Sequence, residues 1–352
     1  MPEKMKGKAV VVTGGGQGIG RVLCRDFARE AANVVIADID ETGIRNQRRK
    51  CGMKKFTDLY AAILLMLILT SCSMAEPEQT IPSRPETVTA STVAAPVEEA
   101  VAMINPNGDT VRDRINVPEG FSRIEAEENS FGHYLNTLPL KPDGSKIKLY
   151  NGDVRNTDFH TAVLDIDIGD RDLQQCADAV MRLRAEYLYE QEAFDRIHFN
   201  FTNGFKADFT RWMKGNSIKV SGNDAFWVEN PASSGEYGSF RKYLEMVFAY
   251  AGTLSLSKEM KEVSVEEMKI GDVFIKGATP GHAVIVLDMA HNETTGENIF
   301  LVAQSYMPAQ DIHILKNPGN DVLSPWYSTK FDDIFETPQW DFDKSQLKRF
   351  AD

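Results

Sequence analysis

This chain contains little cysteine, with four such residues among 352. Cys24 and Cys51 lie near the N-terminus and Cys72 follows a short apolar segment, so Cys176 is the one cysteine after residue 72. The C-terminal part therefore cannot be a disulfide-stabilised scaffold, because Cys176 has no intramolecular partner there. A thiol of this kind is a candidate nucleophile, and the alternative is a small apolar core residue.

Positive charge and metal-binding motifs are also scarce. The 39 Lys and Arg residues are outnumbered by 51 Asp and Glu residues, which gives a net charge of −12. Because nucleic acids are bound chiefly through their phosphates, this acidic chain without a basic stripe is expected to have no nucleic-acid partner. The six histidines show no His-x-x-x-His spacing, so no metal site is expected either.

The apolar run from Leu59 to Leu69 is shorter than the roughly 20 residues that a transmembrane helix needs. It follows Met53-Lys54-Lys55 and leads into Leu69-Thr70-Ser71-Cys72, which has the form of a bacterial lipoprotein signal with its lipobox. Residues 53–72 are therefore predicted to be a lipoprotein signal peptide, and a buried core helix is the alternative. The prediction makes Cys72 the lipidated residue and places the protein in the cell envelope, on the periplasmic or surface face of a membrane.

The first 52 residues have a different character. The stretch 8–12 is typical of a buried strand and runs into the glycine-rich stretch 13–20. A helix is expected over 21–31, and a second strand over 34–38 ends in an acidic residue. Glycines in such a loop let backbone N–H groups approach a pyrophosphate, and the acid can accept a hydrogen bond from a ribose hydroxyl. The candidate cofactor-binding residues are Gly14, Gly18, Gly20 and Asp38.

The pattern Thr13-Gly-x-x-x-Gly-x-Gly20 resembles the short-chain dehydrogenase/reductase family. The resemblance implies NAD(P) as cofactor and an oxidoreductase activity. That family pairs a catalytic Tyr with a Lys four residues later, and none of the ten tyrosines here has such a Lys. Because a lone β-α-β unit cannot bury both faces of a parallel sheet, residues 1–52 are interpreted as an isolated Rossmann-like fragment, joined by a fusion or a gene-model artefact. NAD(P) is expected only if this fragment is functional.

Residues 73–110 are rich in Pro, Glu, Thr, Ser and Ala and contain no aromatic residue. Such a composition cannot bury enough apolar surface to fold, so this stretch is predicted to be a disordered tether. Residues 111–352 fall in the size range of one large domain or two small ones and have ample length for a hydrophobic core.

Cys176 lies where a loop is expected to enter a helix. Asp172 is a plausible N-cap, which would place Cys176 about one turn inside. The positive end of the helix dipole would lower the pKa of the thiol and favour the thiolate. The alternative is that Cys176 packs in the core, because it shares a helical face with Val180 and Leu183.

A candidate base lies downstream of this cysteine. The stretches 282–287 and 299–304 predict two strands of an antiparallel hairpin. His282 begins the first strand and Gln304 ends the second, so the hairpin would present both side chains at one end of a sheet, against the Cys176 helix. A thiol, a proton acceptor and a group that orients the imidazole are the components of nucleophilic acyl transfer.

This order of elements resembles the NlpC-type cell-wall peptidases of the papain-like superfamily. The resemblance implies an α+β papain-like domain with an antiparallel sheet and packed helices, and peptidoglycan peptides as substrates. It makes Cys176 the nucleophile, His282 the base and Gln304 the orienting residue. The chain departs from that family at the nucleophile, where Gln175-Cys176-Ala177 replaces the usual Asp-Cys-Ser. A non-catalytic envelope lipoprotein that binds glycan or peptide remains the alternative.

Four longer phrases resemble a family of bacterial lipoproteins catalogued as domain of unknown function 4846. This resemblance covers roughly Val111 to Phe350 and implies an exported domain without an established activity. The phrases are Asp172–Tyr187, Tyr250–Leu256, Pro280–Val284 and Ala303–Gln310.

Overall fold

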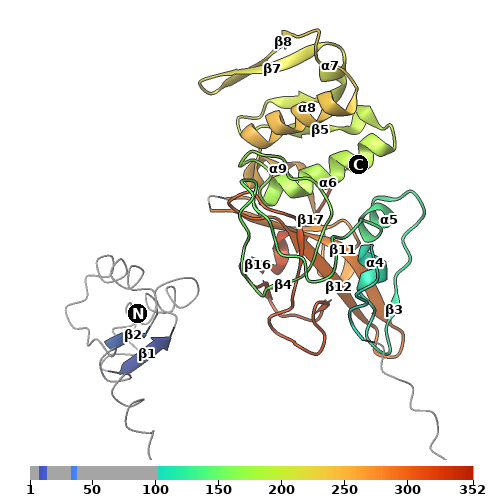
Figure 1. Cartoon of the computed structure of the whole chain (residues 1–352), viewed down its shortest axis with the longest axis vertical. Helices are drawn as coiled ribbons and strands as arrows, with labels where there is room; N and C mark the ends of the chain where they lie inside the picture. Colours follow the sequence, from blue (N-terminus) through green and yellow to red (C-terminus); the bar gives the residue numbers. More distant parts are fainter. Residues whose placement is uncertain (1–7, 14–32, 38–101, 279, 352) are drawn as a thin grey trace, which may run out of the picture. The chain divides into compact units, whose positions relative to one another are not determined.

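The computed structural model describes residues 8–13, 33–37, 102–278 and 280–351 (Figure 1). The chain divides into two compact units, Met1–Val93 and Ala94–Asp352. Several sequence predictions fall outside the described residues, namely the signal peptide at 53–72, the tether up to residue 101, and Gly14, Gly18, Gly20, Asp38 and Cys72.

Two parallel strands are described in the first unit. β1 (Ala9–Thr13) pairs with β2 (Asn33–Ala37), with Ala9 opposite Asn33 and Thr13 opposite Ala37. Both are rich in Val and Ile, whose branched side chains favour extended backbone. The strands agree with those expected at 8–12 and 34–38, whereas the helix expected between them lies outside the described residues.

The second unit is built on a sheet in which all neighbouring strands are antiparallel. Beside the main path, β3 (Ser122–Arg123) pairs with β11 (His282–Asn292), and β14 (Tyr327–Ser328) pairs with β12 (Glu297–Gln304). From one edge to the other the path runs β4 (His160–Val163), β13 (His313–Leu315), β12 (Glu297–Gln304), β11 (His282–Asn292), β10 (Val273–Lys276), β17 (Leu347–Arg349) and β9 (Lys261–Glu262).

The central strand β11 is buried on both faces, and its side chains alternate between two separate cores. Ala283, Ile285 and Leu287 belong to a large cluster that also holds residues of the helices, while Val284 and Val286 belong to a smaller cluster on the opposite face. This alternation follows from the two-residue period of a strand. It explains why β11 and β12 are almost continuously apolar in sequence.

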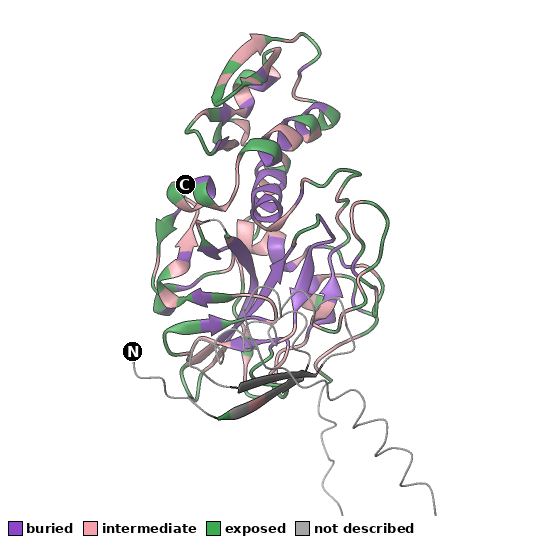
Figure 2. Ribbon diagram, turned by 90° about the vertical axis from the view of Figure 1, so that its left-hand side faces the viewer, coloured by how far each residue is buried: buried purple, intermediate pink, exposed green. Residues whose placement is uncertain are grey.

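Helices cover the first face of the sheet. The longest, α6 (Cys176–Glu190), carries a run of small and apolar residues and is buried around most of its circumference (Figure 2). Its charged residues Arg182 and Glu186 pair with each other at 2.5 Å. The helices that contact the sheet are α4 (Val111–Arg114), α5 (Phe131–Asn136), α6 (Cys176–Glu190) and α9 (Thr253–Glu259), whereas α8 (Tyr237–Tyr250) packs on α7 (Phe209–Met213) and contributes to the same core.

A hairpin covers the second face, formed by β15 (Ile334–Glu336) and β16 (Asp341–Asp343). Phe335 and Phe342 from this hairpin pack on Phe274 of β10, with ring centroids 4.5 and 6.0 Å apart. Burial of large aromatic side chains is among the strongest contributions to packing. The C-terminal segment is therefore held against the sheet directly beside the start of β11.

Smaller elements extend from α6 and α8 (Figure 1). Tyr243 and Trp212 hold them to the core, because the Tyr243 hydroxyl donates to the Ala207 carbonyl and Trp212 Nε1 donates to Ser239 Oγ. These elements are β5 (His198–Asn200), β6 (Lys206–Asp208), α7 (Phe209–Met213), β7 (Asn216–Ser221), β8 (Asp224–Glu229) and the 3-10 turn Phe194–Arg196. Two further 3-10 turns lie beside the sheet: Val265–Glu267, whose Val265 belongs to the smaller core, and Lys344–Gln346, which contacts β10.

The expected α+β class with an antiparallel sheet is confirmed. The hairpin expected at 282–304 is present, and both strands are longer than the sequence pattern suggested. Ordered structure also begins before residue 111, because Ile104 bridges Ile115 and the Asn105 N–H donates to the Arg114 carbonyl. Part of the stretch assigned to the tether is thus integral to the domain.

A buried ion pair fastens β3 to β11. The hydrogen-bond register between β11 and β12 shifts between Val286 and Asp288. The Asp288 carboxylate is fully buried and forms an ion pair with the Arg123 guanidinium. Burial lowers the pKa of Arg123 to about 10, so its guanidinium stays charged at neutral pH. Removing one member of such a pair costs more than removing both, because a lone buried charge has lost its water.

We expect Arg123→Met to lower the free energy of unfolding by about 3–5 kcal/mol, since it leaves the Asp288 carboxylate buried without its partner. Urea denaturation at pH 7 measures this. The double variant Arg123→Met/Asp288→Leu is the matched control and should lose clearly less stability. A double variant as unstable as the single one would contradict the assignment.

Candidate active site

Cys176 is the first residue of α6. The helix is preceded by Gln175, whose backbone N–H donates to Asp178 Oδ2 at 3.0 Å, as in a capping box. The expectation that Asp172 caps the helix, with Cys176 one turn inside, is therefore wrong. Asp172 instead lies in the preceding turn, where its Oδ1 accepts from Gln175 Nε2 and from the Ala309 N–H.

His282 and Gln304 meet at the end of the β11–β12 hairpin. The register places Ile285 opposite Ala303, which brings the first residue of β11 close to the last residue of β12. His282 Nε2 lies 2.7 Å from Gln304 Oε1, and both side chains are almost completely buried. The structure thus joins these two predicted site residues by a direct hydrogen bond.

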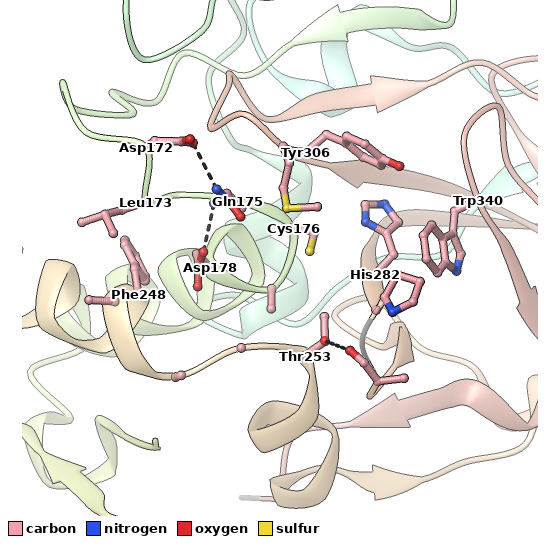
Figure 3. Close-up of a pocket in the computed structure, with 18 residues that line it drawn as sticks. Asp172, Leu173, Gln175, Cys176, Asp178, Phe248, Thr253, His282, Tyr306 and Trp340 are labelled. Atoms are coloured by element: carbon pink, nitrogen blue, oxygen red, sulfur yellow. Dashed lines mark hydrogen bonds between the residues drawn. The ribbon is translucent and has the colours of Figure 1, made fainter. Parts of the chain in front are cut away.

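Cys176 and His282 line one pocket of about 430 Å³. Figure 3 shows the thiol and the imidazole pointing into this pocket from α6 and from the start of β11. Tyr306 and Trp340 flank the imidazole, with ring centroids 4.9 and 5.4 Å from it. Gln304 is not among the lining residues, so it contacts the site through His282.

Small residues keep the middle of the pocket open. The turn between β10 and β11 and the connection from α8 to α9 contribute Ala251, Gly252, Ala278 and Gly281 to the lining. A Cβ atom on Gly281 would lie 2.3 Å from Thr253 Oγ1 and 2.5 Å from the Ala278 carbonyl oxygen. Position 281 therefore requires glycine, and this close approach sets the backbone from which His282 projects.

Burial shifts the pKa values of the thiol and the imidazole in opposite directions. It raises the pKa of Cys176 to about 11, with the Asp178 charge adding to the rise, while backbone N–H groups of Ala177 and Ala283 oppose it. It lowers the pKa of His282 to about 4, against the hydrogen bond to Gln304. The expected lowering of the thiol pKa by the helix terminus is wrong, because desolvation exceeds the dipole effect. At neutral pH both groups are uncharged.

Three residues of this site were not singled out by the sequence. Gln339 and Trp340 lie between β15 and β16, and they reach the site because this hairpin packs beside β11. Trp340 lines the pocket, and Gln339 Oε1 accepts a hydrogen bond from Gln304 Nε2 at 2.6 Å. Asp178 lines the pocket, and burial raises its pKa to about 8. Tyr306 also lines the pocket, whereas the neighbouring Ser305 and Gln310 are buried and do not line it.

The parts of the chain that the structure describes contain no group of three or more His, Cys, Asp or Glu side chains arranged to hold a metal ion. Within the same described residues, no helix has the length and apolarity to cross a membrane.

Two families match this chain. A family described as a domain of unknown function (4846) matches residues 111–349, which include every residue of the pocket. The short chain dehydrogenases match residues 8–66, so this match continues beyond residue 52 into the predicted signal peptide. No solved structure matches the chain.

The similar curated proteins share only a short segment with this chain. Sex determination protein tasselseed-2 of Zea mays is 54% identical over 41 residues, which is 12% of each chain. An uncharacterized oxidoreductase of Thermotoga maritima is 57% identical over 37 residues, which is 10% of this chain and 14% of that protein. This chain therefore spans a small fraction of the length of the curated relatives it matches.

We expect Gly281→Ala to lower the melting temperature and to slow alkylation of Cys176, because the added methyl group forces the turn before His282 to move. Thermal unfolding and mass-spectrometric quantification of the alkylated peptide measure the two effects. Gly238→Ala is the matched control, since a Cβ at that helical position meets nothing within 4 Å. Equal behaviour of the two variants would show that the turn tolerates a side chain.

Proposed function

Because this chain belongs to the family described as domain of unknown function 4846, whose description names no activity, we propose its function from the site itself. The second unit is a cysteine-dependent amide hydrolase with a papain-like arrangement of its residues. The observation that carries the proposal is the shared pocket of Cys176 and His282, with the imidazole bonded to Gln304 on its far side. Nucleophile, base and orienting group are then present in one place.

The reaction follows from the neutral resting state. As the Cys176 sulfur attacks an amide carbonyl carbon, His282 takes the thiol proton. The C–N bond then breaks, and the amine leaves with that proton, which gives a thioester on Cys176. A water molecule, deprotonated by His282, attacks the thioester, and the thiol leaves with the proton to restore the starting state. The first N–H groups of α6, which a helix leaves without intrahelical acceptors, lie at this wall and would stabilise the oxyanion.

Peptidoglycan peptides are the proposed substrates. Lipid on Cys72 would hold the domain at a membrane surface of the envelope, where such peptides are abundant. The pocket walls suit a peptide, since Tyr306 and Trp340 offer apolar ring surfaces and the Asp172 and Asp178 carboxyl groups can hydrogen-bond to peptide N–H groups. No reductase activity is proposed, because the dehydrogenase match covers residues 8–66 and the Tyr-x-x-x-Lys pair is absent from the sequence.

Non-catalytic binding of glycan or peptide is the second candidate function. The observation in its favour is the high thiol pKa, which leaves Cys176 protonated at neutral pH. A pocket with aromatic walls can bind sugar rings or peptides without any chemistry. The two functions differ in whether His282 activates the thiol.

The rate of Cys176 alkylation by iodoacetamide, measured against pH in the full chain, tests the hydrolase. We expect alkylation near neutral pH to depend on His282. This part of the rate should be lost as pH falls through about 4, where the imidazole becomes protonated and can no longer accept the thiol proton. A second rise should follow toward pH 11, as the thiol itself ionises. His282→Ala should lower the rate at pH 7 by about 10²-fold, a usual contribution of a general base.

His291→Ala is the matched control for this measurement. His291 lies near the opposite end of β11, where its Nδ1 is 2.7 Å from Asn298 Oδ1. This variant should leave the alkylation rate unchanged. If His282→Ala has no more effect than His291→Ala, the thiol is not activated and the binding function is favoured.

The lipid anchor has its own test. In a bacterial host supplied with a radiolabelled fatty acid, the wild-type protein should become labelled and sediment with membranes. Cys72→Ser should lose both the label and the membrane association, because the thioether to lipid cannot form. Cys51→Ser is the matched control and should retain both. Label retained by Cys72→Ser would refute the anchor.

A further inference from the structure

His313 lies behind Gln304, fully buried on the neighbouring strand β13 and directly opposite it in the register. Its Nδ1 is 2.9 Å from the Asp311 carbonyl oxygen. A carbonyl oxygen can only accept, so Nδ1 carries the ring hydrogen. Burial lowers the pKa of His313 to about 3, and the ring is therefore neutral with a lone pair on Nε2.

This lone pair fixes the orientation of the Gln304 amide. His313 Nε2 lies 3.3 Å from the Gln304 amide, and a nitrogen that can only accept requires a donor there, which is Gln304 Nε2. Gln339 Oε1 provides a second acceptor for the same NH₂ group at 2.6 Å. The amide oxygen of Gln304 must then point the other way, toward His282.

We propose that His313 and Gln339 are positioning residues that act through Gln304 to set the tautomer of His282. Because Gln304 Oε1 accepts, His282 Nε2 carries the hydrogen, and Nδ1 keeps the lone pair that would take the Cys176 proton. The reverse amide orientation would place an NH₂ group at His282 Nε2 and move the ring hydrogen to Nδ1, which would abolish its function as a base. This inference rests on the proposed function.

Nitrogen-15 NMR of the full chain labelled at histidine tests the proposal directly. Long-range proton–nitrogen correlations distinguish the two neutral tautomers of each imidazole. Between pH 6 and 8 we expect His313 to carry its hydrogen on Nδ1 and His282 on Nε2. A hydrogen on Nδ1 of His282, or on Nε2 of His313, would overturn the proposal. His282→Ala and His313→Phe assign the signals.

The variants provide a readout that a purely structural role would not change. His313→Phe removes the acceptor, so His282 should populate both tautomers and Cys176 alkylation at pH 7 should fall about tenfold, as is typical for the loss of a supporting hydrogen bond. His313→Gln keeps an acceptor oxygen and should restore most of the rate. A folded His313→Phe protein with an unchanged tautomer and rate would refute the proposal.

Gln339 offers the same test at a half-buried position outside the core. If His313→Phe does not fold, Gln339→Leu removes the other acceptor and should lower the alkylation rate about threefold, while Gln339→Glu, which keeps an oxygen there, should not. Equal rates in these two variants would count against the positioning role. Failure of the proposed function can be told apart from failure of this inference. If the proposed function is wrong, His282→Ala leaves the alkylation rate unchanged, whereas NMR reports the tautomers of His282 and His313 in either case.

Discussion

The antiparallel pairing of β11 with β12 fixes the position of nearly everything else in the second unit. Side chains of β11 alternate between two cores, so a slip of one residue in the register would place Ile285 in the core that holds Val284. The same slip would separate His282 from Gln304, whose hydrogen bond spans the ends of the two strands. The register required for burial is thus also the register that assembles the site.

Burial then determines the chemistry that the site can perform. A sheet covered on both faces removes water from the start of β11, and the loss of water disfavours the charged forms of both His282 and Cys176. This buried environment does not stabilise a thiolate–imidazolium pair in the resting site at neutral pH. In the proposed hydrolase, proton transfer would accompany nucleophilic attack, so the direction of the imidazole lone pair would matter more than the resting charge of the thiol.

Local sequence patterns predicted the parts of the site that depend on local structure. The alternation of apolar residues in β11 and β12 identified the hairpin, and hence the proximity of His282 to Gln304, while the segment around Cys176 was correctly assigned to the start of a helix. The exact helix terminus was not predicted, because Asp is a favoured N-cap residue and Gln is not, yet the structure places Gln175 at the cap and Asp172 in the preceding turn. The thiol pKa could not be predicted, because desolvation by distant segments decides it. Trp340 and Gln339 reach the site through the packing of Phe335 and Phe342, which no short-range pattern encodes.

The pocket is assembled from segments that are far apart in the chain, yet all belong to the second unit. The start of α6, the connection from α8 to α9, the turn before β11 and the loop before β16 each supply part of its wall. Close contacts link several of these segments, since Gly281 lies against Thr253 and Gln339 is hydrogen-bonded to Gln304. Side chains held in this way lose little conformational freedom when a ligand binds, which favours recognition by a preformed site. The proposed chemistry would therefore belong to this one folded unit, because every residue that lines the pocket lies in it.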